Sequence, residues 1–211
     1  MDIEDVNAVA VLGAGSMGHG IAEVAALAGF EVRLRDIEAE YVQNGYEQIE
    51  WSLDKLVEQG QLSESDADST LDRISTHVDL SDAVSDVDVV IEAVPEKIAI
   101  KKDVYADLAA AAPEEAIFAT NTSSLSITEL AEETGRPAQF CGMHFFNPPI
   151  RMELVEVISG AQTSEATLEL VTDLAEAMGK TPVRVHKDSP GFIVNRVLTP
   201  LMNEAAWIVE E

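Results

Sequence analysis

The sequence is poor in cysteine, in basic residues and in long apolar runs. Its single cysteine, Cys141, excludes an intramolecular disulfide, and apolar neighbours indicate a buried packing position. No apolar run approaches the length needed to span a bilayer. The acidic N-terminus leads directly into a predicted strand, which argues against a secretory or transit peptide. These features favour a cytoplasmic protein.

Basic residues number 13 against 39 acidic ones, which gives a formal charge of −26. We therefore expect neither nucleic acid nor a membrane surface as a partner. The acidic residues are spread along the chain instead of forming a tail, and this predicts adaptation to high salt. At about 1 M salt the Debye length falls to ~3 Å, so the self-repulsion is tolerable. We expect the protein to unfold in low salt.

The 211 residues are 46% hydrophobic, enough for one large domain or one domain with part of another. Apolar runs alternate with helical patterns, an order that predicts an α/β, Rossmann-like, doubly wound and mostly parallel sheet. The predicted strands are 6–12, 31–35, 87–91, 116–119, 138–143, 155–158 and 182–185. The predicted helices are 16–28, 38–59, 63–71, 96–112, a short one from 126, 164–178 and 190–211.

Two helical segments depart from a simple alternation. Segments 38–59 and 63–71 are longer than a crossover needs, so we expect an inserted helical hairpin that projects from the sheet. The last helix, 190–211, has no later partner and contains Pro200, a predicted kink. Its apolar face would be left uncovered and should seek a partner, with aggregation as the expected result. That face includes Phe192, Val197, Leu201 and Trp207.

A dinucleotide-binding fingerprint, Gly13-Ala14-Gly15-Ser16-Met17-Gly18, lies between the first predicted strand and helix. In this context Gly13 permits the tight turn, Gly15 lets the backbone approach a pyrophosphate, and Gly18 allows close packing. Asp36, 18 residues after Gly18, ends the second strand and would repel a 2′-phosphate, so NAD is favoured over NADP. A purely structural glycine turn is the alternative.

Two polar segments follow neighbouring strands at the carboxyl edge, where such sheets bind ligands. The first is 92–96 and the second is Asn121-Thr122-Ser123-Ser124. Small polar side chains there suit a nicotinamide, but ordinary helix capping explains them equally well.

His144 ends a later apolar strand, and Glu156 is the only acid in the run Leu154-Val155-Glu156-Val157-Ile158. A buried carboxylate needs a partner, and an imidazolium would provide one. The two residues would form a base and its orienting carboxylate, as alcohol oxidation by a nicotinamide requires. A core histidine is the alternative. No metal site is expected.

These motifs together resemble the L-3-hydroxyacyl-CoA dehydrogenases of β-oxidation, including the 3-hydroxybutyryl-CoA dehydrogenases, over nearly the whole chain. The resemblance is carried by five segments. They are Gly13–Gly18, Asn121-Thr122-Ser123-Ser124-Leu125, His144-Phe145-Phe146-Asn147-Pro148, 154–158 and Asp188-Ser189-Pro190-Gly191-Phe192-Ile193-Val194-Asn195-Arg196.

The resemblance implies the individual roles. His144 would be the general base, Glu156 its partner, and Ser123 and Asn195 donors to the substrate oxygens. Ser52 would lie near coenzyme A, with Lys55 as a weaker phosphate candidate. The remaining NAD contacts would be Asp36, Ala93, Glu96, Lys101 and Asn121, although Lys101 also fits an exposed helix lysine.

The resemblance also implies a second, helical domain that closes the substrate cleft and forms a homodimer. Residues 1–187 would be the NAD-binding domain and residues 188–211 only the start of the second, which leaves activity and dimerisation of this chain open. Two other functions remain: oxidation of a free hydroxy acid or sugar acid, and NAD binding without turnover.

Overall fold

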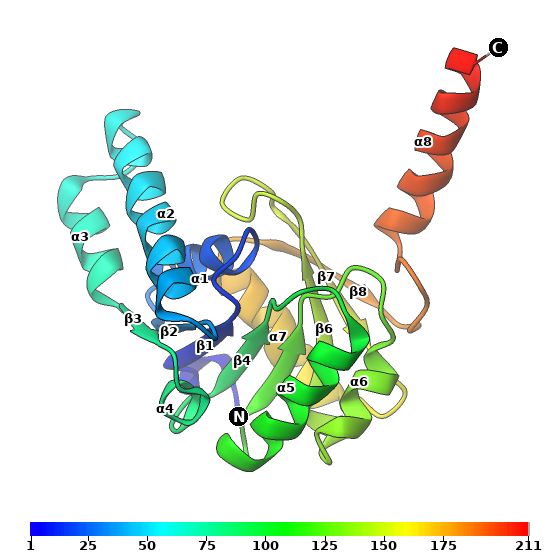
Figure 1. Cartoon of the computed structure of the whole chain (residues 1–211), viewed down its shortest axis with the longest axis horizontal. Coiled ribbons are helices and arrows are strands. Elements are labelled where there is room, and N and C mark those ends of the chain that lie inside the picture. Colours follow the sequence, from blue (N-terminus) through cyan, green and yellow to red (C-terminus); the bar gives the residue numbers. More distant parts are fainter. Residues whose placement is uncertain (211) are drawn as a thin grey trace.

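The computed structural model describes residues 1–210. These residues fold around one eight-stranded sheet (Figure 1). The spatial order is β3-β2-β1-β4-β5-β6-β7-β8, and neighbours are parallel except β6 and β7, which are antiparallel. The strands are β1 (Ala8–Leu12), β2 (Glu31–Arg35), β3 (Ile74–His77), β4 (Val89–Glu92), β5 (Ile117–Thr120), β6 (Phe140–Phe145), β7 (Leu154–Ser159) and β8 (Thr181–Val185). The order reverses at β1, so a crevice is expected at the carboxyl ends of β1 and β4.

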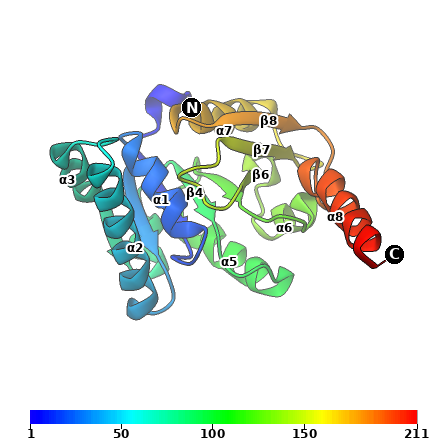
Figure 2. The same cartoon turned by 90° about the horizontal axis from the view of Figure 1, so that it is seen from above.

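Helices cover both faces of the sheet (Figure 2). Residues of α1, α2, α3 and α7 join one apolar core, and residues of α4, α5 and α6 join the other. The helices are α1 (Gly18–Leu27), α2 (Ala39–Glu58), α3 (Glu64–Asp72), α4 (Leu80–Val84), α5 (Ile98–Ala111), α6 (Ile127–Glu133), α7 (Glu165–Ala177) and α8 (Val194–Glu210), with 3-10 turns η1 (Ile3–Asp5) and η2 (Pro137–Gln139).

The central strands are buried because both of their faces are covered. Every residue of β4, β5 and β6 is buried, which explains their continuous apolar runs. Cys141 lies in β6, and burial raises the pKa of its thiol to about 12, so it packs as an apolar side chain. Within residues 1–210, no helix is long and apolar enough to cross a membrane.

Three segments project beyond the carboxyl edge of the sheet: the hairpin of α2 and α3, the loop 146–153 between β6 and β7, and α8 (Figure 1). The hairpin packs against the rest of the domain through buried residues on one side of α2, which include Val42, Ile49 and Leu53. No residue of α8 is buried. The loop lies between the hairpin and α8, so the three segments surround the edge where ligands bind.

The structure corrects the sequence prediction at two places. Strand β3 and helix α4 were not predicted, because β3 is a four-residue edge strand with only Ile74 buried and α4 has five residues. The last helix begins at Val194, four residues later than expected, and Glu211 lies outside the described residues. Phe192 is therefore not on the helix, and it is 3% exposed instead of uncovered.

Candidate active site

The turn between β1 and α1 is shaped by its glycines. Gly13 has φ +98°, and a Cβ there would lie 2.6 Å from the carbonyl oxygen of Ala93. Gly18 packs directly on the Gly13 backbone and leaves no room for a side chain. No atom lies within 4 Å of the position that a Cβ on Gly15 would take. Packing thus explains Gly13 and Gly18, whereas Gly15 leaves open space before the start of α1, where a pyrophosphate fits.

A cavity of about 660 Å³ opens above this turn, a size that suits a cofactor. The Asp36 carboxylate stands at its edge, accepting hydrogen bonds from the backbone N–H groups of Ala14 (2.8 Å) and Ile37 (2.7 Å). Predicted cofactor residues in its wall are Gly13, Gly15, Ser16, Met17, Asp36, Ala93, Glu96 and Asn121. The wall also contains apolar residues that no motif in the sequence indicated: Ile37, Tyr41, Ile100 and Val104.

Lys101, a predicted cofactor contact, lies beneath the cavity and not in its wall. Its side chain is 1% exposed, and its ammonium lies 2.5 Å from Glu92 Oε1 and 3.4 Å from Glu96 Oε2. The other Glu92 oxygen accepts hydrogen bonds from the hydroxyls of Thr120 (2.7 Å) and Tyr105 (3.1 Å). Glu92 itself is fully buried, so Lys101 provides the charge that a buried carboxylate requires.

Glu96 links this buried network to the polar segment after β5. Its Oε1 accepts hydrogen bonds from the Thr122 hydroxyl (2.6 Å) and the Ser123 backbone N–H (2.8 Å). Burial alone would raise the pKa of Glu96, but the Thr122 hydrogen bond and the Lys101 charge outweigh it and hold the pKa below its usual value. Glu96 therefore stays ionised and fixes the backbone at Ser123.

His144 and Glu156 face each other across the antiparallel pair of β6 and β7. Imidazole Nδ1 lies 2.8 Å from Glu156 Oε2, and both side chains are buried. The strand pattern places them together because they occupy directly opposed positions in the register. The structure thus brings together the two residues that the sequence pointed to as a base and its orienting carboxylate.

Glu156 has a second connection that the sequence did not indicate. Its Oε1 accepts hydrogen bonds from the backbone N–H groups of Ile193 (2.9 Å) and Val194 (3.0 Å), where α8 begins. Burial would raise the pKa of Glu156, but the bonds from His144, Val194 and Ile193 outweigh it and lower the pKa. The carboxylate therefore remains charged beside the imidazole.

Aromatic and amide side chains complete the surroundings of His144. The rings of Phe146 and Phe192 lie 4.5 and 5.7 Å from the imidazole, centroid to centroid. Asn121, at the cavity, accepts a hydrogen bond from the backbone N–H of Phe145 (2.9 Å), the residue after His144. Asn195, on the first turn of α8, donates its amide to the Ser123 carbonyl (3.3 Å). The predicted substrate residues Ser123, in the cavity wall, and Asn195, on α8, thus lie together.

The two residues predicted to lie near coenzyme A both bond to glutamates of this chain. The Ser52 hydroxyl donates to Glu23 Oε1 on α1 (2.7 Å), and Lys55 pairs with Glu58 one turn further along α2 (2.6 Å). Glu23 is 1% exposed, and burial raises its pKa to about 7, against the Ser52 hydrogen bond. Ser52 therefore joins α2 to α1 in this structure, and Lys55 is partly neutralised on the hairpin surface.

The doubly wound sheet, the open glycine turn with Asp36 and the buried His–Glu pair define the chain as an NAD-binding dehydrogenase domain. Residues 8–189 match the model of the family "3-hydroxyacyl-CoA dehydrogenase, NAD binding domain", and the chain belongs to this family.

Relatives of known name agree with this assignment. A probable 3-hydroxybutyryl-CoA dehydrogenase of Deinococcus radiodurans is 49% identical over 95% of this chain and 71% of its own length. A Bacillus subtilis protein of the same name is 45% identical over 98% of this chain and 71% of its own. The crystal structure of (S)-3-hydroxybutyryl-CoA dehydrogenase from Ralstonia eutropha superposes with a TM-score of 0.92 at 43% identity, covering 95% of this chain and 70% of that one.

Proposed function

We propose that this chain catalyses the reversible oxidation L-3-hydroxyacyl-CoA + NAD⁺ → 3-oxoacyl-CoA + NADH + H⁺. The observation that carries the proposal is the buried His144–Glu156 pair next to a cavity that suits a dinucleotide. Membership of the 3-hydroxyacyl-CoA dehydrogenase family supports the substrate class. Coenzyme A is the part of the substrate that separates this function from the oxidation of a free hydroxy acid.

In the proposed mechanism, His144 is the general base. The ionised Glu156 accepts a hydrogen bond from the imidazole Nδ1–H, which leaves Nε2 with the lone pair that takes the proton of the substrate 3-hydroxyl. As the imidazole becomes charged, the same carboxylate stabilises it. NAD, when bound, supplies the hydride acceptor. In the reverse direction the imidazolium returns the proton to the 3-oxo oxygen.

Positioning is the second part of the proposal. Ser123, in the wall of the cofactor cavity, and Asn195, on α8, hydrogen-bond the substrate oxygens near the reacting carbon. The glycine turn, Asp36, Ala93, Glu96 and Asn121 hold NAD, while Lys101 supports Glu96 from below. Holding the hydride donor carbon of the substrate close to the acceptor carbon of the cofactor accounts for much of the rate enhancement, because it removes the entropy cost of bringing them together.

We further propose that residues 1–187 form the NAD-binding domain and that residues 188–211 belong to a second, helical unit. The absence of buried residues along α8 supports a separate unit. A homodimer is the proposed state of the full-length protein. A cytoplasmic location and adaptation to high salt stay predictions.

The test mixes the 211-residue chain with NADH in molar KCl and then adds acetoacetyl-CoA. Fluorescence reports NADH binding, and the loss of absorbance reports turnover. We expect both, and we expect acetoacetate without coenzyme A to be a poor substrate. NADH binding with no turnover would instead identify a cofactor-binding fragment, and equal turnover of acetoacetate would identify a dehydrogenase of free acids.

A further inference from the structure

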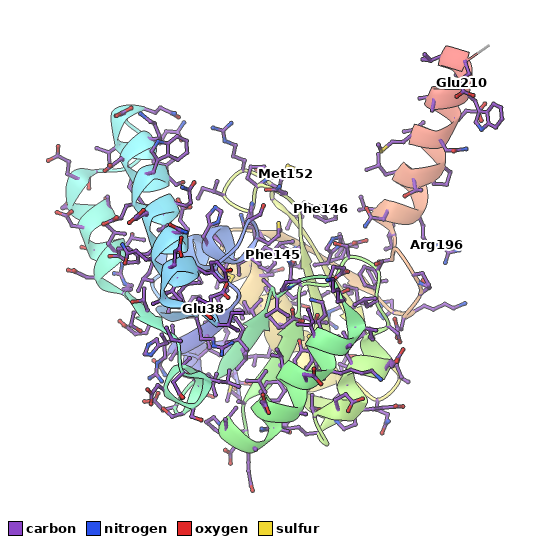
Figure 3. All side chains as sticks on the ribbon, viewed as in Figure 1. Glu38, Phe145, Phe146, Met152, Arg196 and Glu210 are labelled. Carbon is purple, nitrogen blue, oxygen red and sulfur yellow. The ribbon has the colours of Figure 1, made fainter. Side chains whose placement is uncertain are left out.

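The loop 146–153, which follows β6 and its His144, is held from two sides by residues outside the site described above. It starts with Phe146, whose ring lies 4.5 Å from the His144 imidazole. Its centre is a tight turn, in which the backbone N–H groups of Arg151 and Met152 both donate to the Pro148 carbonyl at 3.0 Å. Figure 3 shows Phe146 and Met152 on this projecting segment.

One side of the loop rests on α1. Pro149 is buried, and a Cβ added to Gly20 would lie 2.9 Å from Pro149 Cδ and 3.1 Å from its Cγ. Those distances are too short for a methyl group, so the loop lies this close to α1 only because position 20 is glycine. The loop therefore packs on α1 at Gly20, and the N-terminal end of the same helix faces the cofactor cavity.

The other side is tied by Lys180. Its ammonium donates to the carbonyl oxygens of Pro149 (2.6 Å), within the turn, and Met152 (3.3 Å), at its end. The Lys180 backbone is itself fixed, because its N–H bonds to the Ala175 carbonyl at the end of α7 (2.9 Å). The ammonium is half-buried, and desolvation lowers the pKa of Lys180 against the opposing pull of the Glu153 and Glu23 carboxylates.

We propose that Lys180 is a positioning residue: with Gly20, it clamps the loop 146–153 on α1 so that Phe146 stays against the His144 imidazole. This inference rests on the proposed function, because it assigns the clamp to the dehydrogenase step. A charge-assisted donor that bridges two carbonyl groups is stronger than a neutral one, so a single side chain suffices to hold the turn. Misplacement of a catalytic wall by about 1 Å costs up to ~100-fold in rate.

The test compares Lys180→Met with Lys187→Met, which removes an exposed lysine seven residues further along the chain. Turnover of acetoacetyl-CoA should fall roughly 10- to 100-fold in Lys180→Met, with NADH affinity unchanged. Trypsin should cut the Arg151–Met152 bond faster, because the turn is released. Lys187→Met should match the wild type in each measurement, and Lys180→Arg should restore most of the turnover.

A second variant approaches the clamp from the other side, in case Lys180→Met folds poorly. Gly20→Ala should lift Pro149 from α1 and reproduce both the faster cleavage and the loss of turnover. The ¹⁵N NMR signal of the His144 imidazole gives a readout that needs no turnover, and we expect it to shift or broaden in both variants.

Two results would overturn the inference: wild-type cleavage in Lys180→Met, or faster cleavage with unchanged turnover and an unchanged His144 signal. An inactive wild-type chain would contradict the proposed function alone, since cleavage and the His144 signal would still decide about the clamp.

Discussion

Two carboxylates lie buried near the carboxyl edge of the same sheet, and their partners give them different uses. Glu92, at the end of β4, is bound by Lys101, Tyr105 and Thr120. Glu156, within β7, is bound by His144 and two backbone N–H groups. A lysine partner supplies a compact point charge, whereas histidine is the side chain suited to proton exchange near neutral pH. The first region is therefore built for stability and the second for proton transfer, although both satisfy a buried acid.

The largest effect should come from removing the titratable partner. His144→Gln retains a donor for Glu156 but has no base, so kcat should fall by about 10²- to 10⁴-fold. NADH affinity should not change, because His144 is not in the wall of the cofactor cavity. Stopped-flow turnover and NADH fluorescence measure the two quantities.

The matched control is His186→Gln, at an exposed histidine just after β8. It should keep wild-type turnover. Turnover near the wild-type level in His144→Gln would show that His144 is not the general base. The different roles assigned to Glu92 and Glu156 would then be wrong.

The second effect should appear on the structural side of the comparison. Glu92→Gln leaves the buried Lys101 ammonium without its closest counter-charge, and breaking such a pair typically costs about 3–5 kcal/mol of unfolding free energy. Glu133→Gln removes one partner of Lys102 at the surface and should cost much less, because solvent screens that ion pair. Urea unfolding in molar KCl measures both.

The same substitution at Glu156 sharpens the contrast. Glu156→Gln should lose turnover more severely than Glu92→Gln, because the imidazolium formed in the reaction loses its carboxylate. If Glu92→Gln lowered turnover more than Glu156→Gln did, the division between a stabilising and a reacting carboxylate would be wrong.

Much of this comparison could be predicted from residue patterns. Continuous apolar runs predicted the buried strands, and a lone acid in one of them predicted a partner for Glu156. The short edge strand β3 and helix α4 were missed because few of their residues are buried. The positive φ of Phe192 (+48°) and the late start of α8 were missed because local spacing does not reveal a helix start held by a distant carboxylate.

Contacts between distant elements account for the rest. Ser52 pairs with Glu23 across two helices, and Lys101 turns down to Glu92 instead of toward the cavity. Lys180 binds a loop some 30 residues earlier in the chain. Each of these contacts depends on packing between distant elements, which no periodicity in the sequence encodes.

Glu23 extends the comparison to a buried carboxylate whose hydrogen-bond partner is only a hydroxyl, and it should give the smallest effect. Burial raises its pKa from 4.5 to about 7, so between these values the folded protein holds a proton that the unfolded chain has lost. The contribution of protonated Glu23 to the free energy of unfolding is therefore complete below pH 4.5 and is lost as the pH rises through about 7.

Glu23→Gln keeps an acceptor for Ser52 but cannot ionise. At pH 5 the variant and the wild type should therefore unfold at similar urea concentrations. At pH 8 the variant should be more stable, by up to ~3 kcal/mol at about 1.4 kcal/mol for each pKa unit. Parallel stability curves across this range would mean that Glu23 is ionised at little cost. A hydroxyl, with the charge of Lys180 nearby, would then satisfy a buried carboxylate as well as a directly bonded lysine or histidine does, and the identity of the bonded partner would not be what separates the two regions.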